Sequence, residues 1–304
     1  MAKRKSIDKK SIPFIIIAVI VALCSVIMNG SDTNQPDIAE TTSRFTASSE
    51  NSLLDAYFID VGQGDCTLFI SGSESMLIDC GEKEYSQHVI NSVRNYGITQ
   101  LDYVVVTHAH SDHMGGMADI LDAIPTENII ISEPCENSAA TNIYGNFLDA
   151  ADRSNADIIL AEPDYTFSLG EAECRILAPF NVSSTEENDN SVIMHITAGT
   201  TSFLMTGDTE KKTEKELIKQ YPDLSATILK VAHHGSTSSS GKDFIKQISP
   251  ETAIISVGEN SYGHPKEEVL KTLDNYSVSY LRTDKNGTIH INCSADGYSI
   301  TSDR

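Results

Sequence analysis

Tryptophan is absent from this chain of 304 residues, and cations are scarce, since 22 lysines and arginines stand against 43 aspartates and glutamates. The formal net charge is −21. Proteins that grip nucleic acid along its length usually carry a basic stripe. The obvious cluster of cations is instead N-terminal, at Lys3, Arg4, Lys5, Lys9 and Lys10. The charge balance therefore disfavours a long groove that follows a phosphate backbone.

Long apolar runs are also lacking, with one exception at residues 12–28 (IPFIIIAVIVALCSVIM). This run is at the short end of what crosses a bilayer, for which about 20 residues are typical. The basic residues before it indicate that the N-terminus stays in the cytoplasm. We therefore predict a signal peptide or uncleaved signal anchor at 1–28, a flexible polar linker at 29–52, and one globular domain at 53–304. The domain is then expected on the extracellular face of the cytoplasmic membrane, held through this segment, or secreted if the signal is cleaved.

Cysteines are few as well: six occur, and five of them follow the apolar run. An odd number outside the cell leaves at least one thiol unpaired. Cys66 and Cys80 lie at equal distances from a turn near Gly72, so they are candidates for a disulfide across a hairpin. We favour two free, buried thiols over that disulfide.

The order of apolar patterns predicts an α/β domain. Residues 101–107 (LDYVVVT) form an apolar, β-branched run, which is typical of a strand covered on both faces. Residues 114–124 follow with apolar side chains at helical spacing. The same order of strands and then a helix recurs at 202–206 and 213–220. Two similar halves, each a sheet covered by helices, predict two facing mixed β-sheets with helices outside.

The chemistry of the chain is concentrated in residues 107–116 (THAHSDHMGG), between that apolar strand and the next helix. In an extended loop alternate residues point the same way, so His108 and His110 can share one metal ion. The turn into the helix directs Asp112 and His113 to a second position. Ordinary surface histidines are the alternative, but six of the nine histidines fall into three short motifs. The clustering favours a metal site.

This segment resembles the HxHxDH signature of the metallo-β-lactamase superfamily. Further motifs are similar to the hydrolase domain of the ComEC competence protein family: DVGQGD at 60–65, LIDCG at 77–81, ENDNS at 187–191, LMTGD at 204–208, HHGSTSSS at 233–240 and YGHP at 262–265. The resemblance implies an αββα sandwich with hydrolase activity. The membrane channel of that family is not recognisable here, so we expect a free-standing relative of its hydrolase domain.

The resemblance also implies roles for single residues. Asp208 is expected to bridge two metal ions, and Asp112 to orient the nucleophile as well as to bind metal. One of His233 and His234 completes the second metal position; we favour His234 as the ligand and His233 as a catalytic neighbour. His264 is expected at the pocket rim against the substrate, although it could instead merely precede a helix start.

The polar loops supply the remaining candidates. Asn190, Ser191 and Ser236 are predicted to contact the substrate, although the serines after His234 could equally form a plain flexible loop. Asp60 and Asp65 are predicted to order the loop beside the metal ligands rather than to bind metal.

One departure from the wider superfamily concerns the first metal position. The further histidine usual there is not evident near residues 188–191, and His195, within a strand, is interpreted as structural. The first position is therefore expected to be open or weakly held. We predict two divalent metal ions as cofactors, zinc favoured and manganese compatible with these ligands.

These features predict an exported metal-dependent hydrolase, namely a phosphodiesterase or nuclease of the ComEC type. Two cations lower the pKa of a water between them and offset charge on a phosphoryl centre. The expected substrate is a phosphodiester, either DNA or a cell-envelope phosphoester. Two alternatives remain: an esterase for phosphocholine or teichoic-acid esters, and a metal-binding scaffold without catalysis. No protein partner can be inferred.

Overall fold

The computed structural model describes residues 52–304. The predicted signal or anchor at 1–28 and nearly all of the predicted linker therefore lie outside the described residues, and both stay predictions. Within residues 52–304, no helix has the length and apolar character that crossing a membrane requires.

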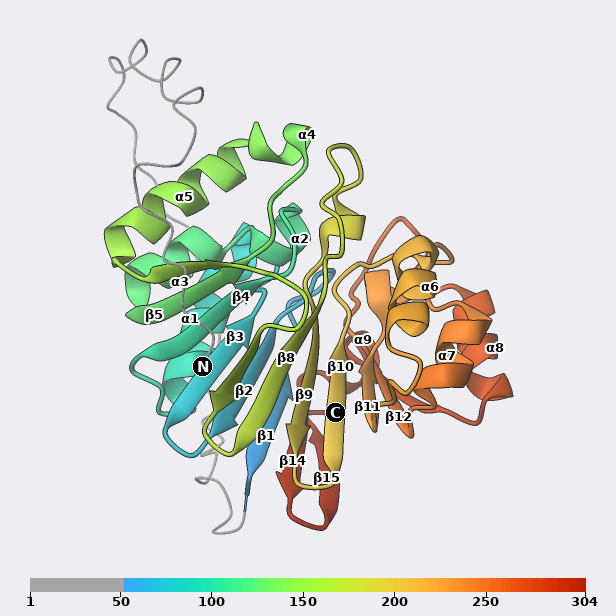
Figure 1. The fold of residues 1–304 in the computed structure, drawn as a ribbon. Coiled ribbons are helices and arrows are strands. Elements are labelled where there is room, and N and C mark those ends of the chain that lie inside the picture. Colours follow the sequence, from blue (N-terminus) through green and yellow to red (C-terminus); the bar gives the residue numbers. More distant parts are fainter. Residues whose placement is uncertain (1–51) are drawn as a thin grey trace. The chain divides into compact units, whose positions relative to one another are not determined.

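Two β-sheets face each other in the described part of the chain (Figure 1). The strands of the first sheet are β1 Leu54–Phe58, β2 Thr67–Ser71, β3 Glu74–Ile78, β4 Leu101–Val106, β5 Thr126–Ile131, β6 Asp157–Leu160, β14 Ile289–Ser294 and β15 Gly297–Ser302. Those of the second are β7 Thr166–Leu169, β8 Ala172–Ala178, β9 Ile193–Ala198, β10 Thr201–Met205, β11 Ile228–Lys230, β12 Thr252–Ile255 and β13 Ser279–Arg282. The strand orders are β15-β14-β1-β2-β3-β4-β5-β6 and β13-β12-β11-β10-β9-β8-β7.

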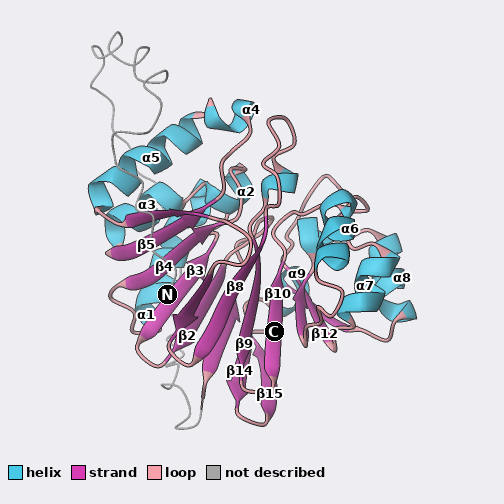
Figure 2. Ribbon diagram, viewed as in Figure 1, coloured by secondary structure: helices cyan, strands magenta, loops and turns pink. Residues whose placement is uncertain are grey.

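Both sheets are mixed, as predicted. In the first, the strands from β15 to β3 pair antiparallel and those from β3 to β6 parallel. In the second, the strands from β7 to β10 are antiparallel and those from β10 to β13 parallel. A parallel pair needs a long crossover, and helices supply these crossovers on the outer faces (Figure 2).

The helices cover the outer face of each sheet. On the first sheet lie α1 Ser86–Asn95, α3 Met117–Ala123 and α5 Asn142–Ser154, and on the second α6 Lys211–Gln220, α7 Lys242–Ile248 and α8 Glu267–Asn275. Short helices fill the connections: α2 Ser111–Met114, α4 Glu136–Ala139, α9 Thr283–Asn286 and the 3-10 turns η2 Lys83–Tyr85, η3 Asn188–Asn190 and η4 Ala232–Gly235. The predicted αββα sandwich is confirmed.

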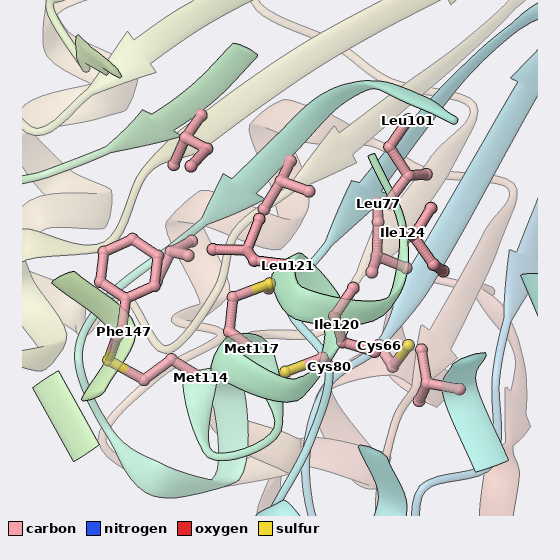
Figure 3. Packing of buried hydrophobic residues seen from close by; sticks show 14 of the residues in the cluster. Cys66, Leu77, Cys80, Leu101, Met114, Met117, Ile120, Leu121, Ile124 and Phe147 are labelled. Carbon is pink, nitrogen blue, oxygen red and sulfur yellow. The ribbon is translucent and has the colours of Figure 1, made fainter. Parts of the chain in front are cut away.

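Three apolar cores separate these layers. Between the sheets, Phe69 of β2 meets Phe203 of β10 edge to face, with ring centroids 5.4 Å apart. Under the helices of the first sheet, Met117 and Leu121 of α3 pack with Phe147 of α5 (Figure 3). The apolar positions predicted at helical spacing after the metal motif are thus the buried face that fixes this segment on the sheet.

Loops that follow parallel strands carry the predicted chemistry. β4 runs directly into residues 107–116, and β10, β11 and β12 end just before Asp208, His233 and the loop at 256–265. The carboxyl ends of parallel strands meet at one edge of a sheet, where α/β folds place their sites. The fold therefore gathers the three histidine motifs at one end of the sandwich.

Strand β6 and the pair Cys66 and Cys80 are two local features to compare with the sequence-based predictions. Strand β6 was not predicted, because its four residues lie between polar stretches. The β2–β3 register pairs Thr67 with Ile78, which extends to Cys66 opposite Asp79 rather than Cys80. Both cysteines are free and buried, as favoured.

Candidate metal centre

Six histidines from the three motifs form one continuous cluster. Ring centroids of successive neighbours lie 4.1–6.3 Å apart, from the His108–His113 pair to the His233–His234 pair. The predicted gathering of these residues is therefore found in the structure. His195 lies apart on β9, where its Nε2 bonds the Ser225 carbonyl oxygen at 3.1 Å, which fits its structural interpretation.

His108 and His110 form the first group of potential ligands. Nε2 of His108 and Nδ1 of His110 face each other at 3.1 Å. Two nitrogens bound to one zinc ion at about 2.0–2.1 Å in tetrahedral geometry lie at a similar separation. Nδ1 of His108 meets the Thr107 hydroxyl at 3.1 Å. The alternation of side chains along the loop thus produces the shared position expected from the sequence.

Asp112, His113, Asp208 and His234 form the second group. Each offers one ligand atom, and these four atoms all lie within 4.8 Å of one another. His113 Nε2 lies 3.2 Å from Asp208 Oδ1, and His234 Nε2 lies 3.2 Å from Asp112 Oδ2. His113, Asp208 and His234 are buried and Asp112 is partly exposed. The favoured choice of His234 over His233 agrees with this arrangement.

Asp79 holds the His113 ring in position. This carboxylate, at the end of β3, accepts hydrogen bonds from His113 Nδ1 at 2.8 Å and from the Thr107 hydroxyl at 2.7 Å and amide at 2.8 Å. Because Nδ1 donates to Asp79, Nε2 is the nitrogen left for a metal ion. No role for Asp79 is predicted from the sequence. A charged residue directly after a buried strand, in LIDCG, was the available signal.

His234 is oriented from two sides. Its Nδ1 donates to the Ser256 carbonyl oxygen at 2.9 Å and lies 3.3 Å from Asp65 Oδ1, so Nε2 turns to the site. Asp65 also pairs at 2.8 Å with Lys230, which is 1% exposed. A buried lysine is expensive unless it is paired, so Lys230 neutralises the carboxylate that supports His234. Sequence reasoning had also missed Lys230, the charged residue closing β11.

Asp112 is fixed through its backbone. Its carbonyl oxygen accepts a hydrogen bond from the Asp65 amide at 3.0 Å. A Cβ at Gly64 would lie 2.5 Å from that same oxygen, so only glycine allows this approach. Asp60, at the other end of the loop, accepts from the Gly62 amide and pairs with Arg304. Asp60 thus orders the loop, whereas Asp65 lies close enough to form a ligand-type group with Asp79 and His113.

His233 and His234 share a sharp bend. Both residues have φ of 51°, in the left-handed region that non-glycine residues seldom adopt. The bend buries His234 and leaves His233 partly exposed, with its Nε2 3.7 Å from Asp208 Oδ2 and its Nδ1 3.1 Å from the Ser238 hydroxyl. His233 therefore stands beside the second group and reaches open space.

Charge within the cluster is tightly coupled. Burial disfavours the ionised form of Asp208, but the neighbouring His113 and His234 outweigh it and hold the pKa of Asp208 well below its usual value. Burial likewise opposes protonation of His234, yet the facing carboxylates, Asp208 foremost, raise its pKa to about 10. Asp208 is thus anionic, and His234 holds a proton that a cation would replace.

The chemistry of this donor set fits divalent metal ions. Imidazole nitrogens and carboxylate oxygens are the ligands of zinc and manganese sites. Asp208 Oδ1 and His113 Nε2 are buried and make no hydrogen bond among the described residues. The two atoms face each other at 3.2 Å, and buried polar atoms are normally hydrogen-bonded, so a shared cation fits their arrangement.

Three residues predicted to contact substrate face inward instead. Asn190 is fully buried, and its side-chain amide bonds the backbone of Ser183 in both directions. The Ser191 hydroxyl accepts from the Asp208 amide at 3.1 Å and lies 3.5 Å from His108. The Ser236 hydroxyl accepts from the backbone amide two residues on. Asn190 and Ser236 thus bond within their own loops. The buried Ser191 instead supports Asp208 and His108 from behind, so all three shape the site.

His264 lies beside His233, and its predicted place at the pocket rim stays a prediction. Its ring centroid is 5.7 Å from that of His233, and burial with nearby positive charge lowers its pKa to about 4. Helix α8 begins after Lys266, so His264 is not its cap. Tyr262 stacks on His264 at 5.6 Å and is 64% exposed.

A hollow of about 230 Å³ opens beside His110. Its walls are acidic, with Glu186, Glu187, Asp189 and Glu210 among the lining residues. Glu187 is committed to structure, because its two oxygens accept from the amides of Ala109 and Cys135, each at 2.7 Å. Glu186 and Glu210 leave the hollow negative.

The chain is similar to known proteins in sequence and in fold. The family model described as Metallo-beta-lactamase superfamily matches residues 59–259. ComE operon protein 3 of Bacillus subtilis (strain 168) is 33% identical over 256 residues, which are 76% of this chain and 32% of that protein. Competence protein ComA of Neisseria gonorrhoeae is 30% identical over 241 residues, 78% of this chain and 32% of that protein. The chain spans about a third of the length of these curated relatives.

Solved structures share the fold at low identity. The metallo-beta-lactamase fold protein YhfI from Bacillus subtilis aligns with a TM-score of 0.52 at 15% identity, over 77% of this chain and 98% of that one. CmlA, a diiron beta-hydroxylase from Streptomyces venezuelae, aligns with a TM-score of 0.53 at 11% identity, over 80% and 54%. At such identities the likeness extends to the fold alone.

Proposed function

The chain belongs to the metallo-β-lactamase superfamily, and we propose that it is a metal-dependent phosphodiester hydrolase of the nuclease type that acts outside the cytoplasmic membrane. Its relatives include ComE operon protein 3 and a protein named competence protein ComA, in agreement with the resemblance to the ComEC family. The convergence of two ligand groups, His108 with His110 and Asp112, His113, Asp208 with His234, carries the proposal. The apolar segment at 12–28 supports the export part.

The residues of this chain have separate tasks in such a reaction. Asp112 is partly exposed, with its Oδ2 3.2 Å from His234 Nε2, and is placed to orient a water for attack. His233, open on one side and 3.7 Å from Asp208, is placed to hold or pass a proton near that water. His264 at the rim offers an uncharged imidazole to the leaving group. Bound divalent ions would supply Lewis acidity, which lowers the pKa of a water and offsets charge on the phosphoryl oxygens.

A second hypothesis for an enzymatic function rests on the acidic hollow beside His110. Glu186 and Glu210 repel a polyanion there but attract a cationic group. A small envelope phosphoester with a quaternary amine, such as phosphocholine, has this combination. A scaffold without catalysis is the third reading, and the partly exposed Asp112 and His233 argue against it, because metal storage needs no open nucleophile-orienting group.

Hydrolysis assays separate the three readings. The full chain, purified in detergent and loaded with zinc or manganese, is offered bis-p-nitrophenyl phosphate, p-nitrophenyl phosphocholine and single-stranded DNA. We expect cleavage of the first and third. Asp208→Ala should lower both rates by about 100-fold or more, since even partners that only orient ligands contribute 10–100-fold, whereas the surface variant Asp122→Ala should not.

Other outcomes point elsewhere. Cleavage of the phosphocholine ester without cleavage of DNA would establish the envelope esterase. No turnover at measured full metal occupancy, with either ion, would leave the scaffold.

A further inference from the structure

Six lysines gather on two neighbouring helices beside the metal centre. They are Lys211, Lys212, Lys215 and Lys219 of α6 and Lys242 and Lys246 of α7, here called the α6–α7 lysine face. The two helices carry three acidic residues, whereas the rest of the described chain carries ten lysines and arginines against 35 aspartates and glutamates. In so acidic a protein this is a local reversal of charge.

The lysine face begins at the metal centre. Helix α6 starts three residues after Asp208, and α7 starts directly after the loop that carries His233 and His234. Lys212, Lys215 and Lys219 recur at the spacing of one helix face, opposite the buried Leu217. Each step of four residues advances about 6 Å along the helix axis. The ammonium groups therefore extend in a row that leads away from the ligands.

Most of this charge is free. Lys215, Lys219, Lys242 and Lys246 are exposed, and no carboxylate among the described residues lies within ion-pair distance of them. Lysines that serve only the fold usually pair with a neighbouring acid, as Lys271 does with Glu267 on α8 at 2.7 Å. Free ammonium groups are available to an external anion.

A hollow of about 240 Å³ lies between the two helices and the Ser-rich loop. Lys211, Lys215 and Lys242 line it together with Ser240, which is 4% exposed and whose hydroxyl finds no partner among the described residues. Glu214, Asp243 and Glu268 also line it. The two oxygens of Glu214 accept from the Ser240 and Gly241 amides, and burial raises its pKa to about 7. Beside these carboxylates the hollow offers ammonium groups and a free hydroxyl, which are donors that hold a phosphate.

An exposed aromatic ring lies beside the histidine motifs from which α6 and α7 follow. Tyr262 is 64% exposed and stacks on His264, which itself neighbours His233. Proteins that hold single strands combine cations along the backbone with aromatic rings on which bases stack. A duplex keeps its bases stacked inside, so a rim tyrosine suits an unpaired base.

We propose that the α6–α7 lysine face and Tyr262 form the binding surface for a single-stranded nucleic acid, with the phosphate backbone along the lysines and a base on Tyr262. The proposal rests on the phosphodiesterase function and names the substrate class and the path by which it reaches the site. It also explains how an acidic protein can take a polyanion: the acidic hollow beside His110 is avoided, and the strand approaches over α6 and α7.

Binding measured as a function of salt tests the lysine face. The metal-loaded full chain is titrated with an oligothymidylate whose phosphorothioate linkages resist cleavage. Two variants carry four alanine substitutions each. The test variant changes Lys215, Lys219, Lys242 and Lys246, and the matched control changes Lys83, Arg94, Lys271 and Lys285. We expect the test variant to bind at least about tenfold more weakly and to lose about 2–3 from its log–log salt slope, at about 0.7 per phosphate contact. Equal effects in both variants, or none in the test variant, would overturn the proposal.

A separate binding experiment tests Tyr262. Tyr262→Ala should weaken binding by about tenfold, since stacking contributes about 1–3 kcal/mol per base, while Tyr276→Ala, at an exposed tyrosine on the end of α8, should not. The loss should vanish with an abasic oligomer of equal charge. If the lysine variant loses affinity but Tyr262→Ala does not, the partner is a base-free polyphosphodiester such as teichoic acid, and the nucleic-acid assignment fails.

Hydrolysis of bis-p-nitrophenyl phosphate, measured on the same samples, separates this inference from the proposed function. An active test variant with undiminished affinity refutes the binding surface and leaves the phosphodiesterase. Inactive chains whose affinity depends on the lysine face and on Tyr262 refute the phosphodiesterase and leave the surface.

Discussion

Replacement of Asp79 by asparagine is expected to weaken metal binding without removing any ligand. The carboxylate accepts three hydrogen bonds, of 2.7–2.8 Å, from the Thr107 amide, the Thr107 hydroxyl and His113 Nδ1. An asparagine can keep its carbonyl oxygen against the Thr107 amide. Its NH2 group then faces His113 Nδ1, which must give up its proton to accept. The proton moves to Nε2, the nitrogen that a metal ion requires.

The size of the effect follows from this change of tautomer. Partners that orient metal-bound histidines contribute about 10–100-fold to metal affinity, or about 1.4–2.7 kcal/mol. The hydrogen bonds of the carboxylate within the fold contribute about 1.5–3 kcal/mol to stability when one partner is charged. Asp79→Asn should therefore bind zinc about 10–100-fold more weakly and unfold at lower denaturant concentration.

Competition titration of the metal-free chain with a chromogenic chelator measures the affinity, and circular dichroism checks folding. Asp102→Asn is the matched control, because Asp102 lies on β4 of the same sheet and accepts from the Ser75 amide away from the site. The reasoning is refuted if Asp79→Asn stays folded and keeps the metal affinity of the parent. Loss of stability with equal metal affinity would reduce Asp79 to a structural residue.

Three further predictions follow from buried charge. Facing carboxylates raise the pKa of His113 well above its usual value and that of His234 to about 10, so metal ions must displace protons. The metal affinity should therefore rise as the pH rises from 6 to 8, by about tenfold per pH unit for each proton displaced. Calorimetry in buffers of different ionisation enthalpy measures the proton release. Lys230→Met leaves Asp65 without its 2.8 Å partner and should destabilise the fold by about 3–5 kcal/mol in denaturant titration; loss below about 1 kcal/mol would contradict the pairing. Burial raises the pKa of Glu214 from 4.5 to about 7. Its contribution to stability is therefore full below pH 4.5 and is lost as the pH rises through 7, by about 3 kcal/mol. Glu214→Gln should flatten this part of the profile of stability against pH, and an unchanged profile would refute the raised pKa of Glu214.

The part of the site that lies in one stretch of chain could be predicted from the sequence. His108, His110, Asp112 and His113 follow one strand and open one helix, so their directions depend on local geometry alone. The positions of Asp208 and His234 came from resemblance, not from spacing. In both cases a buried strand end before the ligand fixes its place, but only β4 is marked by a run of β-branched residues.

The supporting residues could not be predicted, because their partners are remote in sequence. Asp79 meets His113 across 34 positions, and Lys230 meets Asp65 across the gap between the two sheets. In the sequence each is a single charge at the end of a short apolar strand, which is equally typical of an exposed end. The prediction that Asn190 and Ser191 contact the substrate was made because polar loop residues usually face open space. The turn η3 instead directs both side chains inward.

The two ligand groups are supported unequally, and this bears on the first metal position. Every histidine of the second group has a buried partner on its far nitrogen, Asp79 behind His113 and the Ser256 carbonyl behind His234. The first group has only the Thr107 and Ser191 hydroxyls behind His108, and His110 is partly exposed. Since such partners set ligand basicity and orientation, the second position should fill at lower metal concentration, and the first only at higher. Titration with zinc should show two separate binding steps, with His110→Ala removing the weaker one; a single step of two equivalent ions would contradict this order.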